Sequence, residues 1–124
     1  MTDQKTTIND LKKEVARFVK ARNWEKFHSP KNLSMAIAIE AAELMEHFQW
    51  HYKGEDIRRL NNKRNEIEDE LADILAYVLS FCNLYQIDLS QALIRKLKLN
   101  AKKYPSKLVK GKAHKYSYYK ESDG

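Results

Sequence analysis

The chain has 124 residues, the length of one domain, and 43% of them are hydrophobic while 32% are charged, as is typical of a globular protein. Three glycines and two prolines offer little material for tight turns, which disfavours a β-sandwich, and the single cysteine excludes an internal disulfide. The formal net charge of +6 favours an anionic partner. The polar N-terminus is unlike a signal peptide and no apolar run is long enough for a membrane span, so we expect an all-α, cytoplasmic protein.

The first predicted helix spans residues 7–22. Thr7 and Asp10 have the spacing of a capping box, and apolar residues follow them at helical intervals. Residues 23–30 break the pattern and form a predicted loop that holds three ring side chains: Trp24, Phe27 and His28. Such rings either close the end of a helical bundle or stack against a planar ligand such as a nucleobase.

Two later stretches predict an antiparallel pair of acidic helices. Residues 33–52 contain no Gly or Pro and are rich in Ala, Leu and Met, and residues 66–85 repeat the combination of an apolar helical face with an acidic stripe beside it. Each stretch places carboxylates at i, i+3 beside its apolar face. The two predicted stripes together hold Glu40, Glu43, Glu70 and Asp73. Residues 55–64 between the helices are highly charged, and no structure is predicted for them.

A fourth helix is predicted to begin at a cap formed by Asp88 or Ser90 and to end before Pro105. Its periodicity brings together Lys96, Asn100 and Lys103, with Tyr104 beside them. We therefore expect a four-helix bundle-like domain over residues 1–105, followed by a basic, Tyr- and Lys-rich tail over residues 106–124. The first acidic helix also carries apolar residues opposite its acidic stripe, which indicates a homodimer or homotetramer: Met35, Ala38 and Met45.

Four carboxylates in one cleft repel one another and require positive charge. Arg or Lys side chains could supply it, as could a divalent ion, and oxygen ligands suit Mg²⁺, with Mn²⁺ as a substitute. A nucleoside triphosphate would add about four negative charges, so two or three Mg²⁺ would be needed, and a carboxylate not fully engaged could orient a water nucleophile. A rival zinc or iron site would use Glu43, His47 and His51, which are spaced i, i+4, i+8.

The acidic motifs give the sequence a family resemblance. They are Ile39-Glu40-Ala41-Ala42-Glu43 and Glu70-Leu71-Ala72-Asp73, flanked by Phe27-His28-Ser29-Pro30, Phe48-Gln49-Trp50 and Asn100-Ala101-Lys102-Lys103-Tyr104-Pro105. The chain resembles the MazG-like, all-α nucleoside triphosphate pyrophosphohydrolases, and within them the dCTP pyrophosphatase branch. Ile39 replaces the first glutamate of the general family pattern.

The resemblance implies a Mg²⁺-dependent house-cleaning enzyme that cleaves a dNTP, such as dCTP or a modified dCTP, between its α- and β-phosphates. It implies that the metal ligands and catalytic residues are Glu40, Glu43, Glu70 and Asp73. The residues that it implies for the base and sugar are Trp24, His28, Trp50 and Tyr77, and those for phosphates or ribose are Lys96, Asn100, Lys103 and Tyr104. The alternative function is a non-catalytic basic helical module that binds nucleic acid, which explains the net charge but gives the acids no role.

Overall fold

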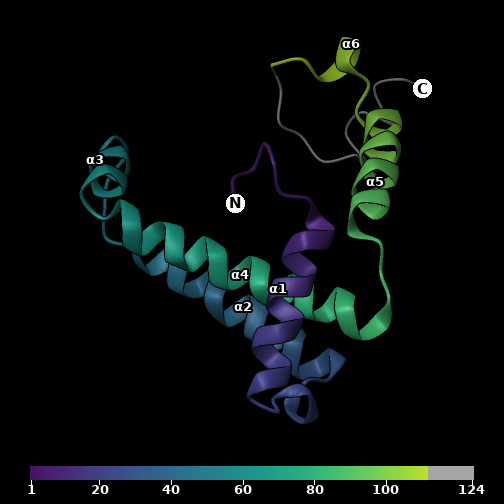
Figure 1. Ribbon diagram of the computed structural model, residues 1–124. Helices are drawn as coiled ribbons and strands as arrows, with labels where there is room; N and C mark the ends of the chain where they lie inside the picture. The colour runs from purple at the N-terminus through teal and green to yellow at the C-terminus, as the bar shows by residue number, and fades with distance from the viewer. Residues whose placement is uncertain (112–124) are drawn as a thin grey trace. The chain divides into compact units, whose positions relative to one another are not determined.

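A computed structural model describes residues 1–111, and the regular structure within them is helical (Figure 1). The elements are α1 Ile8–Ala21, the 3₁₀ turn η1 Glu25–Phe27, α2 Pro30–Glu46, α3 Glu55–Asn62, α4 Arg64–Tyr85, α5 Leu89–Lys103 and α6 Ser106–Val109. The all-α prediction is confirmed, with α1, α2, α4 and α5 as the four expected long helices. The chain divides into two compact units, residues 1–87 and the part that begins at Asp88.

Helix α1 begins with the capping box that the sequence predicts. The backbone N–H of Asp10 donates to Thr7 Oγ1 at 3.0 Å, and the backbone N–H of Thr7 donates to Asp10 Oδ2 at 3.0 Å. These two bonds satisfy N–H groups that the first turn of a helix leaves without intrahelical partners. The helix is tied to the end of α4, since Asn83 Nδ2 donates to the Lys12 carbonyl at 3.0 Å and Lys12 Nζ donates to the Ile87 carbonyl at 2.6 Å.

The end of α2 differs from the prediction. The helix stops at Glu46 rather than at Tyr52, because the chain tightens into a turn in which the Phe48 N–H donates to the Met45 carbonyl at 2.9 Å. Gly54 then adopts a φ of +95°, which a residue with a side chain rarely adopts, and the unpredicted helix α3 follows it. This turn places α3 beside the end of α2.

Helices α2 and α4 make the most extensive contact in the first unit and lie side by side in opposite directions (Figure 1). Helix α1 packs against α4 as well. The most deeply buried apolar side chains of the unit are Val19, Leu33, Ile67, Leu79 and Cys82. Burying them stabilises the α2–α4 pair, which is therefore the frame on which the acidic side chains are held.

In the second unit, Asp88 rather than Ser90 caps α5, because the Gln91 N–H donates to Asp88 Oδ1 at 2.9 Å. Helix α5 ends just before Pro105, as predicted, and the short helix α6 follows. The predicted domain boundary at residue 105 stays a prediction, and most of the predicted tail, residues 112–124, lies outside the described residues. No helix within residues 1–111 combines the length and the apolar character needed to cross a membrane.

Candidate metal and nucleotide site

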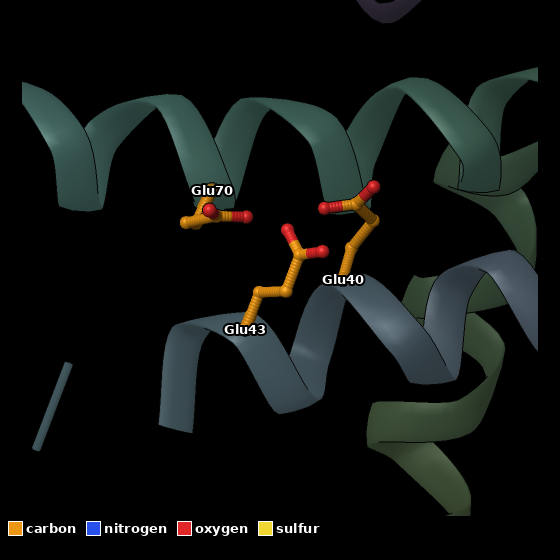
Figure 2. A group of neighbouring side chains, drawn as sticks. All are labelled: Glu40, Glu43 and Glu70. Atoms are coloured by element: carbon orange, nitrogen blue, oxygen red, sulfur yellow. The ribbon is translucent and has the colours of Figure 1, made fainter. Parts of the chain in front are cut away.

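Three carboxylates converge between α2 and α4. Glu40 and Glu43 extend from α2 toward Glu70 on α4 (Figure 2), and one oxygen atom of each lies within 4.8 Å of the others. The i, i+3 spacing brings the first two to the same side of α2, and the antiparallel packing places Glu70 opposite them. Three of the four carboxylates that the sequence places on the two acidic stripes therefore converge in the structure.

The electrostatic state of these acids is unfavourable without a cation. Burial, together with the adjacent Glu43 carboxylate, raises the pKa of Glu40 to about 7. Burial is also the largest cause of a raised pKa at Glu70, to which the charges of Glu43 and Asp73 contribute. Glu40 Oε2 and Glu70 Oε2 are both buried without a hydrogen-bond partner. Buried oxygen atoms of this kind normally have a partner, so the site has unused capacity to bind a ligand.

A salt-bridge network does not supply that partner. The ion pairs found within residues 1–111 are Arg17–Glu14, Lys63–Glu66 and Arg64–Glu68, and none of them involves the converging acids. A set of hard oxygen donors with buried, unpartnered atoms fits a divalent cation such as Mg²⁺. We therefore identify Glu40, Glu43 and Glu70 as the group in this part of the chain that could hold a metal ion.

Two predicted metal-site features are placed differently. Asp73 lies one turn beyond Glu70 on α4, is exposed, and falls outside the converging group, so its role as a ligand stays a prediction. The zinc or iron alternative required His47 and His51 on one helical face with Glu43. Because α2 ends at Glu46, His51 does not continue that face, and neither histidine joins the acidic group.

An aromatic cavity of about 240 Å³ lies toward the N-terminal end of α2 and is lined by Trp24, Phe27, His28, Asn32, Leu33, Ala36 and Tyr77. Two hydrogen bonds hold the segment that leads into α2 at the edge of this cavity. Ser29 Oγ caps α2 by accepting from the Asn32 N–H at 3.1 Å, and Asn32 Nδ2 donates to the Phe27 carbonyl at 3.0 Å. The structure thus brings together three of the four residues that the resemblance implies for the base, together with Phe27 of the predicted loop, and it adds Asn32.

A second cavity, of about 270 Å³, shares His28 with the aromatic cavity and is otherwise lined by Ala16, Val19, Lys20, Glu25, Ser80, Asn83 and Leu84. In both cavities an asparagine donates its amide N–H to a backbone carbonyl, Asn32 to Phe27 and Asn83 to Lys12. A carbonyl can only accept, so each bond fixes which end of the amide is the NH₂ group. The amide oxygens of Asn32 and Asn83 are therefore left to act as acceptors.

The other predicted binding residues lie elsewhere. Trp50 follows the end of α2, is 82% exposed, and does not line the aromatic cavity. Lys96 and Lys103 are exposed on α5, while Asn100 and Tyr104 are partly buried there. All four belong to the second unit, so their contact with phosphates or ribose stays a prediction.

A third cavity, which we call the acidic cavity, was not anticipated from the sequence. It measures about 440 Å³ and is lined by Glu43, Glu46, His47, Arg59 and Glu70. Arg59 comes from α3, in the segment for which the sequence pattern predicted no structure. Its Nε donates to the His47 carbonyl at 3.2 Å. This bond joins α3 to the end of α2 at the edge of the carboxylate cluster.

Comparisons with known proteins place this geometry in a family. A model of the MazG-like family matches residues 35–118. dCTP pyrophosphatase 1 from Homo sapiens is 34% identical over 113 residues, which cover 90% of this chain and 66% of that protein. The protein of the same name from Mus musculus is 36% identical over 113 residues, with the same coverage of 90% and 66%. The chain thus spans slightly less than two thirds of the length of these curated relatives.

A solved structure also matches the fold. It is the crystal structure of a pyrophosphatase from Archaeoglobus fulgidus, which is 37% identical and superposes with a TM-score of 0.77. The match covers 85% of this chain and 98% of the archaeal chain. An all-α fold, an acidic cluster between two antiparallel helices and a family match over most of the sequence lead to one conclusion. The chain belongs to the MazG-like family.

Proposed function

We propose that the protein is a Mg²⁺-dependent nucleoside triphosphate pyrophosphohydrolase that acts on dCTP or a modified dCTP. The observation that carries this proposal is the group formed by Glu40, Glu43 and Glu70, in which one oxygen of Glu40 and one of Glu70 are buried without a hydrogen-bond partner. The same two helices also contribute Ala36 and Tyr77 to the cavity lined by ring side chains. The similarity to proteins named dCTP pyrophosphatase 1 supports the same reaction. Removal of unwanted nucleotides from the pool is the corresponding house-cleaning role.

In this reaction a water molecule adds to the α-phosphorus, the α–β anhydride bond breaks, and the products are the nucleoside monophosphate, pyrophosphate and a proton. Bound Mg²⁺ supplies the positive charge that offsets the phosphates and makes a water acidic enough to attack near neutral pH. Glu40, Glu43 and Glu70 would hold the ion, and Asp73 stays a proposed fourth ligand. A carboxylate oxygen not engaged with the ion can orient the water and accept its proton.

The orientation of two amides supports cytosine as the base. Asn32 and Asn83 use their NH₂ groups on backbone carbonyls, so each keeps an amide oxygen that can accept, and each lines one of the two cavities that share His28. Cytosine carries an exocyclic amino donor where thymine and uracil carry a carbonyl oxygen. An acceptor matches the donor and leaves the carbonyl without a partner, so these side chains favour dCTP over dTTP and dUTP.

The test of this function is a panel of the common dNTPs and NTPs with 5-methyl-dCTP, incubated with and without Mg²⁺. Monophosphate and pyrophosphate are measured together. Metal-dependent release of both in equal amounts establishes the reaction, and the ranking of substrates establishes the base and sugar preference. If no nucleotide yields either product with Mg²⁺ or Mn²⁺, the proposed function is wrong, and the nucleic-acid alternative becomes the next to test.

We expect His28→Ala to raise KM for dCTP by roughly tenfold, because this partly buried ring forms a wall common to both cavities. Steady-state kinetics on dCTP measures the change. His51→Ala is the matched control, since His51 is exposed and lines neither cavity. Equal KM values for the two variants would place the base elsewhere.

We also propose that the protein is a homodimer, or a homotetramer built from dimers, in the cytoplasm where free nucleotides are available. Its α2 helix exposes Met35, Ile39 and Met45 by 52%, 56% and 69%, respectively. Three large apolar side chains exposed on one helix favour a partner surface that covers them. Light scattering should therefore give at least twice the chain mass, and Met45→Glu should shift it toward the monomer. A monomeric wild-type protein would contradict the proposal.

A further inference from the structure

We propose that Arg59 binds the β- and γ-phosphates of the substrate, the part that leaves as pyrophosphate. This inference rests on the proposed function, because it assigns one end of the same triphosphate. Arg59 lines the acidic cavity together with Glu43 and Glu70, which also belong to the carboxylate group. The acidic cavity is thus continuous with the carboxylates where the α-phosphate would react.

The order of sites along α2 gives the direction of the substrate. Ala36 lines the aromatic cavity, Glu40 belongs to the carboxylate group, and Glu46, the last residue of α2, lines the acidic cavity. At 1.5 Å per residue, Glu40 lies about 6 Å along the axis from Ala36, and Glu46 lies about 9 Å farther on. A nucleoside triphosphate is elongated, with its base and γ-phosphate at opposite ends. With the base in the aromatic cavity and the α-phosphate at the carboxylates, the remaining phosphates extend into the acidic cavity.

The state of the Arg59 side chain suits a phosphate ligand. It is partly buried, and its Nε is held on the His47 carbonyl at 3.2 Å. Within residues 1–111, no ion pair includes Arg59, although its cavity is lined by three glutamates. The N–H donors of its two terminal nitrogens are therefore not committed to a carboxylate. A guanidinium fixed in this way is pre-organised for the paired oxygens of a phosphate group.

Charge balance in the acidic cavity points the same way. Phosphate oxygens there would face Glu43, Glu46 and Glu70, so cations are needed besides the metal. Among the five residues that line this cavity, one carries an Arg or Lys side chain, and that residue is Arg59. Its neighbour Arg58 lies on the same helix but is exposed and does not line the cavity. The two arginines therefore allow a charge-matched comparison.

The experiment measures the affinity of the whole protein for two products in the presence of Mg²⁺, inorganic pyrophosphate and dCMP, by calorimetry. Arg59→Met should weaken pyrophosphate binding by roughly 10- to 100-fold, the loss expected for charge-assisted hydrogen bonds. It should change dCMP binding by less than about twofold, because dCMP occupies the other end of the site. Arg58→Met should bind both products like the wild type, and Arg59→Lys should recover part of the pyrophosphate affinity.

Other outcomes separate this inference from the proposed function. If wild-type protein hydrolyses a dNTP while Arg59→Met and Arg58→Met bind pyrophosphate equally well, Arg59 has no phosphate role and the function stands. A parallel loss of dCMP affinity in Arg59→Met would show that Arg59 only supports the fold, which also overturns the inference. If the wild type hydrolyses no nucleotide, the proposed function is wrong and the inference falls with it, even where pyrophosphate binding depends on Arg59. If the wild-type protein does not bind pyrophosphate in the presence of Mg²⁺, the inference about Arg59 is also overturned.

Discussion

Replacing Glu43 with Gln is expected to lower kcat/KM for dCTP by on the order of 10²–10³-fold while the helical fold is retained. Glu43 belongs to the converging carboxylates and also lines the acidic cavity, so it faces both the proposed metal and the proposed phosphates. Gln keeps the size of the side chain but removes the charge that a hard cation requires. Kinetics with dCTP gives the loss of turnover, and a Mg²⁺ titration followed by thermal unfolding gives the loss of metal binding.

The matched control for this substitution is Glu68→Gln on α4. Glu68 is exposed, lies outside the acidic group, and pairs with Arg64 at 3.2 Å, so its loss should cost less than about 1 kcal/mol of stability and leave turnover unchanged. Metal-free Glu43→Gln should also unfold at a slightly higher temperature than the wild type, since one of three repelling charges is gone. Full activity in Glu43→Gln would exclude the carboxylate group as the metal site. A loss of helicity would show that the acid serves the fold.

The acidic site was predictable from the sequence because its spacing is local. Glu40 and Glu43 are one turn apart, so any helix through them brings both to the same side, and the apolar stripe of each helix indicates which side is buried. The Thr7 capping box was predictable for the same reason, since all of its atoms lie within four residues. Glu70 required only that the second acidic helix pack antiparallel, which it does.

The end of α2 was not predictable in this way. Phe48, Trp50 and Tyr52 continue without a Gly or Pro, so local propensity alone extends the helix to Gly54. The structure instead turns after Glu46, and the freed His47 carbonyl accepts from Arg59, twelve residues later in the chain. A hydrogen bond between two helices cannot be read from periodicity. That is why both α3 and the acidic cavity were missed.

The remaining differences concern residues whose role depends on packing. Asp73 follows Glu70 at i, i+3, yet it is exposed, because a helical interval sets a direction and not the depth of burial. Trp50 was expected on the last turn of the first acidic helix, but α2 ends at Glu46, so Trp50 lies beyond the helix. Lys96 and Asn100 share a face of α5, as expected from their i, i+4 spacing. The helical spacing does not determine which other part of the protein, or which ligand, that face contacts. Their assignment to phosphates depends on how the second unit docks.

The last prediction concerns stability as a function of pH. The pKa of Glu40 is raised from its usual value of 4.5 to about 7 in the folded protein, chiefly by burial. Between these two values the folded state keeps a proton that the unfolded state releases, so the free energy of unfolding falls as pH rises from 4.5 to 7 and then levels off. At about 1.4 kcal/mol per pH unit the full effect is about 3 kcal/mol, and solvent access to a half-buried group reduces it to about 1–2 kcal/mol.

Mg²⁺ should counteract this loss, because it binds the ionised carboxylates and stabilises the folded state in proportion to its occupancy. In thermal unfolding without metal, the midpoint should therefore drop by roughly 5–10 °C between pH 5 and pH 8, and Mg²⁺ should raise it far more at pH 8 than at pH 5. Glu40→Gln should reduce the pH dependence, with the remainder due to Glu70, whose pKa is also raised by burial, whereas Glu68→Gln should leave it unchanged. A midpoint that rises with pH in metal-free protein would mean that Glu40 is already ionised and paired in the fold. The carboxylate group would then need no cation.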